Sequence, residues 1–207
     1  MKNLLLTSAG MNVKDEILKI LPKPPKETKL AHIITASHDE KDTSYVTKDS
    51  RIMEEVGFQV EEVDIASKNE SELRQILKSK DVIYVQGGGT FYLMKCVSES
   101  GFDKVVRELI EKGVIYVGVS AGSYIACPSI EMAAWKHNHD KHGLTSFDGM
   151  NLVPFLLFVH YLPEYASNLR RHIKESPYEV KILTDDQAIL VRGDKYQLVG
   201  KGPEITL

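Results

Sequence analysis

Short apolar runs alternate with longer segments of helical periodicity in the first part of the chain. The apolar runs predict strands at residues 3–7, 30–35, 58–63, 82–85 and 114–119. Apolar residues recur at helical spacing between them, which predicts helices at 13–21, 47–55, 70–77 and 102–111. Strands that are apolar throughout, such as 82–85, are typical of sheets covered by helices on both faces. The pattern therefore predicts an α/β fold of three layers around a parallel sheet.

The pattern changes after Pro128. A polar stretch at 136–142 precedes an apolar run at 152–160, a predicted helix at 166–175 and several short apolar runs between 180 and 207. Turn sequences at 192–195 (Arg-Gly-Asp-Lys) and 200–203 (Gly-Lys-Gly-Pro) separate the last runs as in hairpins, so we expect short antiparallel strands at the C-terminal end. No repeat, linker or low-complexity segment marks a boundary, so residues 1–207 are expected to form a single domain.

Composition narrows the classes of function. The formal net charge is -3 and no cluster of Lys and Arg stands out, which argues against a nucleic-acid partner. No run approaches the roughly 20 apolar residues of a membrane span, and the apolar N-terminal run is too short for a secretion signal. Cys96 and Cys127 lack metal or CxxC spacing and are expected to be buried and reduced, as in the cytoplasm. No cofactor is implied, and the sequence leaves a homodimer open.

A candidate nucleophile lies between a predicted strand and a predicted helix. Residues 118–122 read Gly-Val-Ser-Ala-Gly, with Ser120 at the centre. In this setting Gly-x-Ser-x-Gly forms a sharp turn that lifts the serine hydroxyl above the sheet edge. The N–H of Ala121 is then one candidate donor for an oxyanion hole. The alternative is a strand-to-helix turn without chemistry, because so short a motif also occurs by chance.

A glycine-rich turn at 87–90 (Gly-Gly-Gly-Thr) follows the preceding strand. The absence of a following Lys and of GxGxxG spacing argues against a phosphate loop. As a neighbour of the predicted elbow, the turn can supply a second oxyanion donor, the N–H of Gly88. The alternative is a purely structural glycine turn.

A serine nucleophile needs a base, normally a histidine oriented by a carboxylate. His160 ends the apolar run at 152–160, where a strand would deliver its side chain to the active edge of the sheet. Other histidines lack such a setting, since His32 lies within a predicted strand, His38 in a charged loop and His172 on a polar helix.

A second group of polar residues is a candidate metal site and comprises His137, His139, Asp140 and His142. Interspersed lysines would oppose a cation, and a solvated loop lacks the fixed partners that orient metal-binding histidines. We therefore expect no metal site there.

The chain resembles the peptidase E family of serine peptidases, which includes aspartyl dipeptidases and is related to cyanophycinases. The resemblance spans most of the chain and rests on three blocks, at 87–91, 116–128 and 149–161. The last block ends in Val-His-Tyr, where the family has a similar His-Tyr. The resemblance implies a fold like the flavodoxin-like glutaminase domain of amidotransferases.

The resemblance also implies a catalytic triad, with a nucleophile matching Ser120 and a base matching His160. The family carries its acid two residues after a Leu, which selects Asp185 in the segment 183–188. From the residues alone, Asp186 would orient the histidine equally well.

Three positions depart from the family. Gly89 stands where asparagine is usual, Tyr124 where aspartyl dipeptidases carry an asparagine, and Trp135 where they carry a functional aspartate. Gly89 and Trp135 are the two positions that we expect to contact substrate. An indole cannot supply the charge of an aspartate, so aspartyl dipeptides are expected to be poor substrates.

The sequence thus predicts a serine peptidase that cleaves amide bonds of small peptides through Ser120, His160 and Asp185. An esterase of the common α/β-hydrolase type is a weaker interpretation, because in those enzymes the acid precedes the histidine along the chain. A third interpretation, suggested by the altered loop at Trp135, is a catalytically idle member that acts as a small-molecule binding or regulatory module.

Overall fold

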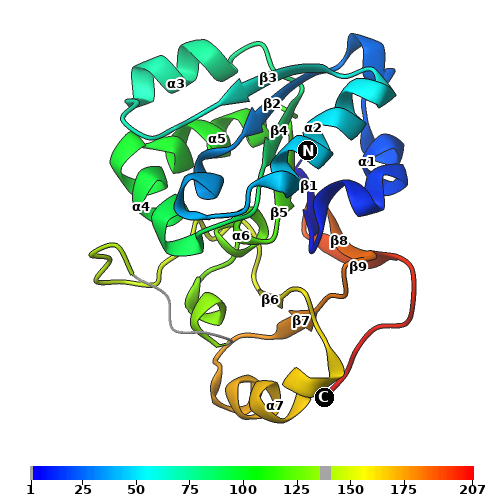
Figure 1. The fold of residues 1–207 in the computed structure, drawn as a ribbon, viewed down its shortest axis with the longest axis vertical. Helices are drawn as coiled ribbons and strands as arrows, with labels where there is room; N and C mark the ends of the chain where they lie inside the picture. Colours follow the sequence, from blue (N-terminus) through cyan, green and yellow to red (C-terminus); the bar gives the residue numbers. More distant parts are fainter. Residues whose placement is uncertain (1, 136–140) are drawn as a thin grey trace.

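The computed structural model describes residues 2–135 and 141–207. Among these residues a seven-stranded sheet runs in the order β3-β2-β4-β5-β1-β8-β9 (Figure 1). The strands are β1 (Asn3–Thr7), β2 (Lys29–Ile33), β3 (Gln59–Val63), β4 (Val82–Val85), β5 (Ile115–Val119), β8 (Gln187–Arg192) and β9 (Lys195–Gly200). Strands β1 to β5 pair in parallel, whereas β8 and β9 form an antiparallel hairpin beside β1. The predicted α/β fold, with antiparallel strands at the C-terminal end, is confirmed.

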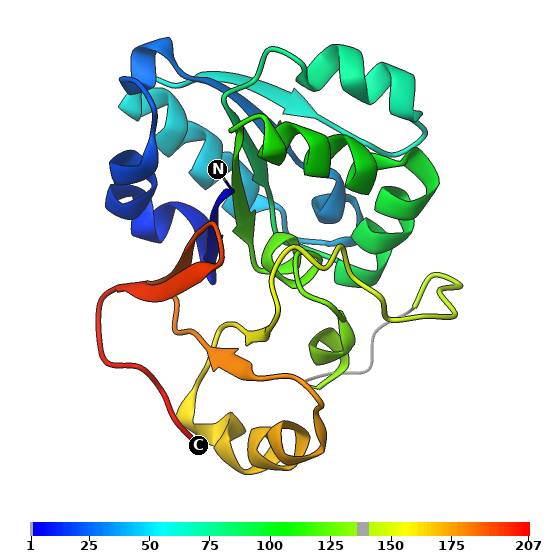
Figure 2. The same cartoon turned by 180° about the vertical axis from the view of Figure 1, so that it is seen from behind.

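Helices cover both faces of this sheet (Figures 1 and 2). One face carries α1 (Lys14–Ile20) and α2 (Ser44–Val56), and the other carries α3 (Glu70–Leu77), α4 (Thr90–Ser100) and α5 (Phe102–Glu111). Successive side chains of a strand point to opposite faces, and β1 shows this directly. Leu5 packs in the cluster under α1 and α2, whereas Leu4 and Leu6 pack in the cluster under the other helices. Burial on both faces explains why the strands are apolar throughout.

A smaller unit lies beyond the carboxyl ends of the central strands (Figure 1). It contains β6 (Leu156–Phe158), β7 (Val180–Ile182) and, between them in the chain, α7 (Ala166–Glu175). β6 and β7 pair in parallel, with Phe158 opposite Ile182. The expectation of antiparallel pairing is therefore wrong for β7, because a connection that contains a helix returns the chain in the same direction.

The last residues, 203–207, form no strand, although the turn at 200–203 had suggested one. Pro203 has no N–H to donate to a ladder, and its carbonyl accepts a hydrogen bond from the Gln187 side chain at 2.9 Å. Ile205 and Leu207 pack instead against the main apolar cluster.

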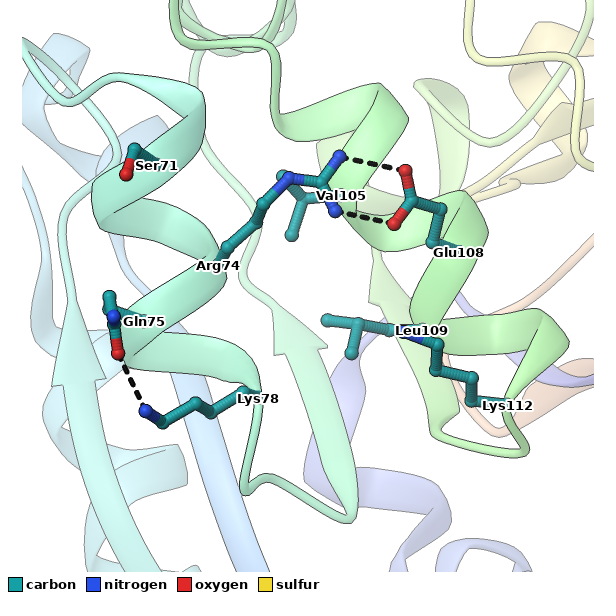
Figure 3. A pocket seen from close by; sticks show the side chains of 8 residues that line it. All are labelled: Ser71, Arg74, Gln75, Lys78, Val105, Glu108, Leu109 and Lys112. Atoms are coloured by element: carbon teal, nitrogen blue, oxygen red, sulfur yellow. Dashed lines mark hydrogen bonds and ion pairs between the residues drawn. The ribbon is translucent and has the colours of Figure 1, made fainter.

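Charged side chains join α3 to α5 on the surface. Figure 3 shows Arg74 of α3 reaching across to Glu108 of α5. Its Nη2 lies 2.7 Å from a Glu108 oxygen and 2.8 Å from a Glu70 oxygen, so one guanidinium links two carboxylates. The groove beside this cluster holds about 380 Å³.

Candidate active site

Ser120 follows β5 in a backbone conformation that side chains rarely adopt. Its φ is 47° and its ψ is -105°, and such a conformation is kept only where surrounding contacts enforce it. The Ser120 N–H donates to the Thr7 carbonyl at 3.1 Å, and the Ser120 carbonyl accepts from the N–H groups of Ser123 and Tyr124 at 2.9 Å each. The strand and the short helix α6 (Ala121–Tyr124) therefore hold the serine from both sides.

Buried polar side chains brace the turn beneath Ser120. The Ser123 hydroxyl lies 2.8 Å from the carbonyl oxygens of both Thr7 and Gly118, and the Tyr116 hydroxyl donates to the Gly122 carbonyl at 2.6 Å. A side chain at Gly122 would collide with the backbone of β4, so only glycine lets α6 approach the sheet this closely. This packing explains why the elbow needs small residues on each side of the serine.

His160 and Asp185 are brought together by the pairing of β6 with β7. Each follows the end of one of these parallel strands, so both emerge at the same edge. The pairing continues past the strand ends, because Leu183 donates to the Phe158 carbonyl at 2.8 Å and Tyr161 donates to the Leu183 carbonyl at 3.0 Å. The small sheet thus delivers both side chains to the carboxyl edge of the large one.

The three predicted side chains form a continuous chain of contacts. His160 Nε2 lies 3.0 Å from Ser120 Oγ, and His160 Nδ1 lies 2.6 Å from Asp185 Oδ1. When Nε2 accepts the serine proton, Nδ1 carries its own hydrogen and donates it to the carboxylate. Asp186 is exposed, and its described hydrogen bond is from the Lys201 N–H to its backbone carbonyl, so Asp185 is the acid that meets the histidine.

The glycine turn at the end of β4 passes beside the serine. A Cβ added at Gly87 would lie 3.1 Å from the Ser120 Cβ. Gly88 has a φ of 136°, and a side chain there would collide with the Ala36 carbonyl, so this position requires glycine on both counts. Among the hydrogen bonds of the described residues, none uses the N–H of Gly88 or of Ala121. Neither donor is therefore committed to another group among the described residues.

A model of peptidase family S51 matches residues 4–199. This chain belongs to that family. It is 33% identical over 197 residues to an uncharacterized peptidase of Listeria monocytogenes, with 93% of this chain and 96% of the relative covered. It is 28% identical over 186 residues to peptidase E of a Nostoc species, with 86% and 73% covered. The resemblance to peptidase E seen in the sequence is thereby confirmed.

Solved structures agree with this family assignment. A crystal structure provisionally assigned to peptidase E, from Listeria monocytogenes, superposes with a TM-score of 0.87 at 32% identity and covers 98% of this chain and 100% of that one. A crystal structure of a peptidase from an acI-B1 actinobacterium superposes with a TM-score of 0.76 at 17% identity, covering 100% of this chain and 94% of that one. The second likeness is one of fold.

The S51 site contains a fourth polar residue that sequence reasoning missed, Ser8. Its hydroxyl donates to Asp185 Oδ1 at 2.6 Å and accepts from the backbone N–H of His160 at 2.9 Å. The side chain is completely buried. One signal could have found it, since Ser8 directly follows β1, which lies beside β5 with Thr7 opposite Val119. A polar residue at the carboxyl end of the strand next to the nucleophile is a candidate site residue.

A cavity of about 450 Å³ opens over these residues. Its lining comes from β-strand ends and from α2, namely Ser8, Ala9, Asn12, Glu40, Tyr45, Lys48, Asp49, Gln86, Gly87, Gly88, Val119, Ser120, His160 and Asp185. His160 and Asp185 keep side-chain exposures of 43% and 53%, so water can reach the pair. The volume is in the range of sites that hold small ligands.

The structure describes both positions that the sequence predicts to contact substrate, Gly89 and Trp135. Gly89 donates its N–H to the Ala36 carbonyl at 2.9 Å, and a side chain there would collide with Asp39. Trp135 is 9% exposed, and its ring stacks on His172 with centroids 4.8 Å apart. Neither residue is among those that line the described cavity, and their contact with substrate stays a prediction.

The structure describes only part of the group of His and Asp residues at 137–142 that the sequence singled out. His137, His139 and Asp140 lie outside the described residues, whereas His142 Nε2 lies 3.0 Å from an Asp39 oxygen.

Cys96 and Cys127 are buried and form no disulfide. Within residues 2–135 and 141–207, no helix is long and apolar enough to cross a membrane. The cytoplasmic location and the homodimer stay predictions.

Proposed function

We propose that this member of family S51 is a serine-type peptidase that hydrolyses amide bonds of small peptides. The contact of 3.0 Å between Ser120 Oγ and His160 Nε2, on a serine held in a strained turn, is the observation that carries the proposal. Strained backbone of this kind is retained where function requires a side chain in one position.

In the proposed mechanism, Ser120 Oγ attacks the scissile carbonyl carbon and passes its proton to His160 Nε2. The Oγ–C bond forms as the carbonyl π electrons move to oxygen. When the tetrahedral intermediate collapses, the C–N bond breaks and His160 returns the proton to the leaving amine. Water then gives a proton to the same imidazole and bonds to the acyl carbon. The C–Oγ bond breaks, the proton returns to Ser120 Oγ, and the carboxylic acid product leaves. Asp185 holds the Nδ1–H throughout and stabilises the imidazolium.

The negative charge on the carbonyl oxygen requires donors fixed in advance. The N–H groups of Gly88 and Ala121 are assigned this role in the proposal. Ala121 follows Ser120 in the chain, Gly88 lines the same cavity as Ser120, and neither N–H is used by the described hydrogen bonds. A preorganised donor costs no reorganisation during the reaction, which is why backbone groups of tight turns suit this task.

The proposed substrates are small peptides. The cavity of about 450 Å³ has the size for such ligands, and Glu40, Lys48 and Asp49 are among the residues that line it. Relatives named peptidase E support a peptide substrate. Gly89 and Trp135 are proposed to shape specificity, and the sequence predicts poor turnover of aspartyl dipeptides.

Labelling and turnover together test this function. We expect a fluorophosphonate probe to label the wild-type protein at Ser120 and not the matched Ser120→Ala variant. A panel of dipeptides should then reveal hydrolysis that the same variant lowers by at least about 10³-fold. Asp-Leu should be a poorer substrate than neutral or aromatic dipeptides, because specificity is a ratio of kcat/KM values.

The results of labelling and turnover distinguish the serine peptidase from the binding or regulatory module. A folded wild-type protein without labelling or turnover would instead favour the binding or regulatory module. A preference for Asp-Leu of more than about tenfold, or roughly 1.4 kcal/mol, would contradict the predicted specificity and leave the serine mechanism intact.

A further inference from the structure

Both peptide groups of Gly87 are held by side chains. Its N–H donates to Gln86 Oε1 at 3.2 Å, and its carbonyl accepts from the Tyr45 hydroxyl at 3.3 Å. The turn passes so close to Ser120 that a Cβ at Gly87 would lie 3.1 Å from the serine Cβ. The orientation of the backbone beside the nucleophile therefore depends on Tyr45 and Gln86.

The bond from Tyr45 acts on the same peptide unit that contains the proposed oxyanion donor. The carbonyl of Gly87 and the N–H of Gly88 belong to one peptide group, which is planar and trans. In such a group the C=O and N–H point in opposite directions. A donor that fixes the carbonyl also fixes the direction of the N–H, and a bonded carbonyl makes the N–H a stronger donor.

We propose that Tyr45 is a positioning residue for catalysis, which holds the Gly87 carbonyl so that the Gly88 N–H points to the oxyanion. The inference rests on the proposed serine peptidase function. Tyr45 does not touch the reacting atoms in this role, and its effect on the reaction passes through the peptide group.

The surroundings suit Tyr45 to act as a donor. Burial, together with the nearby carboxylates of Glu40 and Asp42, raises the pKa of the Tyr45 hydroxyl to about 12. The hydroxyl therefore keeps its proton at neutral pH. Tyr45 lies in the first turn of α2, so its ring approaches the glycine turn from a rigid element.

The second brace is fixed by a buried chain of hydrogen bonds. Gln86 is completely buried and donates from Nε2 to Asp49 Oδ2 at 3.2 Å. The same carboxylate oxygen accepts from the Tyr84 hydroxyl at 2.6 Å. With its amide nitrogen committed to Asp49, Gln86 presents its oxygen to the Gly87 N–H.

The test uses Tyr45→Phe, which keeps the ring and removes the hydroxyl. Loss of a direct oxyanion donor costs 10²- to 10³-fold, so an indirect brace should slow fluorophosphonate labelling of Ser120 by about tenfold. With a dipeptide that the wild-type protein hydrolyses, kcat should fall by a similar factor and KM should change by less than about twofold. The pH midpoint of labelling should stay the same, because His160 is not affected.

Two further variants guard the interpretation. Tyr196 lies on the exposed strand β9, and its hydroxyl donates to Glu179. The Tyr196→Phe variant removes that hydroxyl, and we expect Ser120 of this variant to be labelled at the wild-type rate. Gln86→Leu removes the other brace and should also slow labelling. If Tyr45→Phe is labelled within about twofold of the wild-type rate, or if its pH midpoint of labelling shifts, the inference about Tyr45 is overturned. The serine mechanism would still be supported by labelling of the wild-type protein. A wild-type protein that is not labelled would overturn both.

Discussion

Two hollows of similar size show how differently one chain arranges polar side chains. The active-site cavity of about 450 Å³ lies at the carboxyl ends of the strands, and the groove of about 380 Å³ lies between α3 and α5 (Figure 3). In the groove, Arg74 pairs with Glu70 and Glu108, and the three side chains are 40% to 44% exposed. In the cavity, hydrogen bonds from separate segments converge on one histidine and one serine.

The difference identifies what marks a site of chemistry. Charges in the groove neutralise one another in water, and the pKa of Glu108 is lowered because Arg74 donates to it. The cavity instead keeps two residues, Ser120 and His160, at positive φ, and it buries two of the polar side chains that brace them, Ser8 and Ser123. Strain and convergence, which both cost free energy, separate the cavity from the groove, whereas size and charge do not.

The largest effect on stability is expected at a buried polar group that belongs to neither hollow. His32 in β2 is completely buried, and its Nε2 has no hydrogen-bond partner within residues 2–135 and 141–207. Burial lowers the pKa of His32 from 6.5 to about 4. The folded protein therefore binds this proton less readily than the unfolded chain. The contribution of neutral His32 to the free energy of unfolding is present above pH 6.5 and should be lost as the pH falls toward 4. The loss amounts to about 3 kcal/mol.

The His32→Phe variant tests this prediction. Phe keeps a ring against Tyr84, which lies edge to face with His32 at 5.3 Å, and it cannot bind a proton. Urea unfolding at several pH values should give a flatter curve for the variant between pH 6.5 and 4. Labelling of Ser120 at neutral pH should not change. If the free energy of unfolding depends on pH in the same way for both proteins, the prediction is contradicted. Slower labelling of the variant would show that packing around His32 also affects the reactivity of Ser120.

The fold could be predicted from the sequence because local patterns determine it. The runs at 3–7 and 82–85 and the helix at 70–77 match β1, β4 and α3 to the residue. The direction of β7 could not be predicted in this way. A three-residue strand has no periodicity that distinguishes parallel from antiparallel pairing, and the connection through α7 decides it.

The site could be predicted where one residue type carries the chemistry. Ser120, His160 and Asp185 all follow strand ends. The family blocks contain Ser120 and His160, whereas Asp185 is selected only by the family's acid two residues after a Leu, and the residues alone leave Asp186 open. Ser8 and Tyr45 escaped notice because their roles depend on distant partners, 177 residues away for the bond from Ser8 to Asp185 and 42 for the bond from Tyr45 to Gly87. Tyr45 has no local signature, and the one signal for Ser8 is its position directly after β1, the strand beside β5.

A smaller effect, on activity, is expected for Ser8→Ala. The change removes a donor to Asp185 Oδ1 and the Ser8 hydroxyl that accepts from the backbone N–H of His160. A loss of about tenfold in kcat with little change in KM is expected, because one hydrogen bond contributes about 1 to 1.5 kcal/mol. Ser98→Ala is the matched control, since that hydroxyl donates to the Met94 carbonyl within its own helix, α4. Equal kcat values for Ser8→Ala and wild type would assign Ser8 to packing.

The smallest effect is expected in the groove, for Arg74→Met. The variant keeps most of the aliphatic stem and removes the charge between Glu70 and Glu108. Because exposed ion pairs are screened by water and salt, Tm should fall by no more than about 3 °C, and the difference should shrink as salt is added. Labelling of Ser120 should equal that of wild type. A large, salt-independent fall in Tm, or slower labelling, would show that the groove is coupled to the cavity, and convergence would then no longer separate the two hollows.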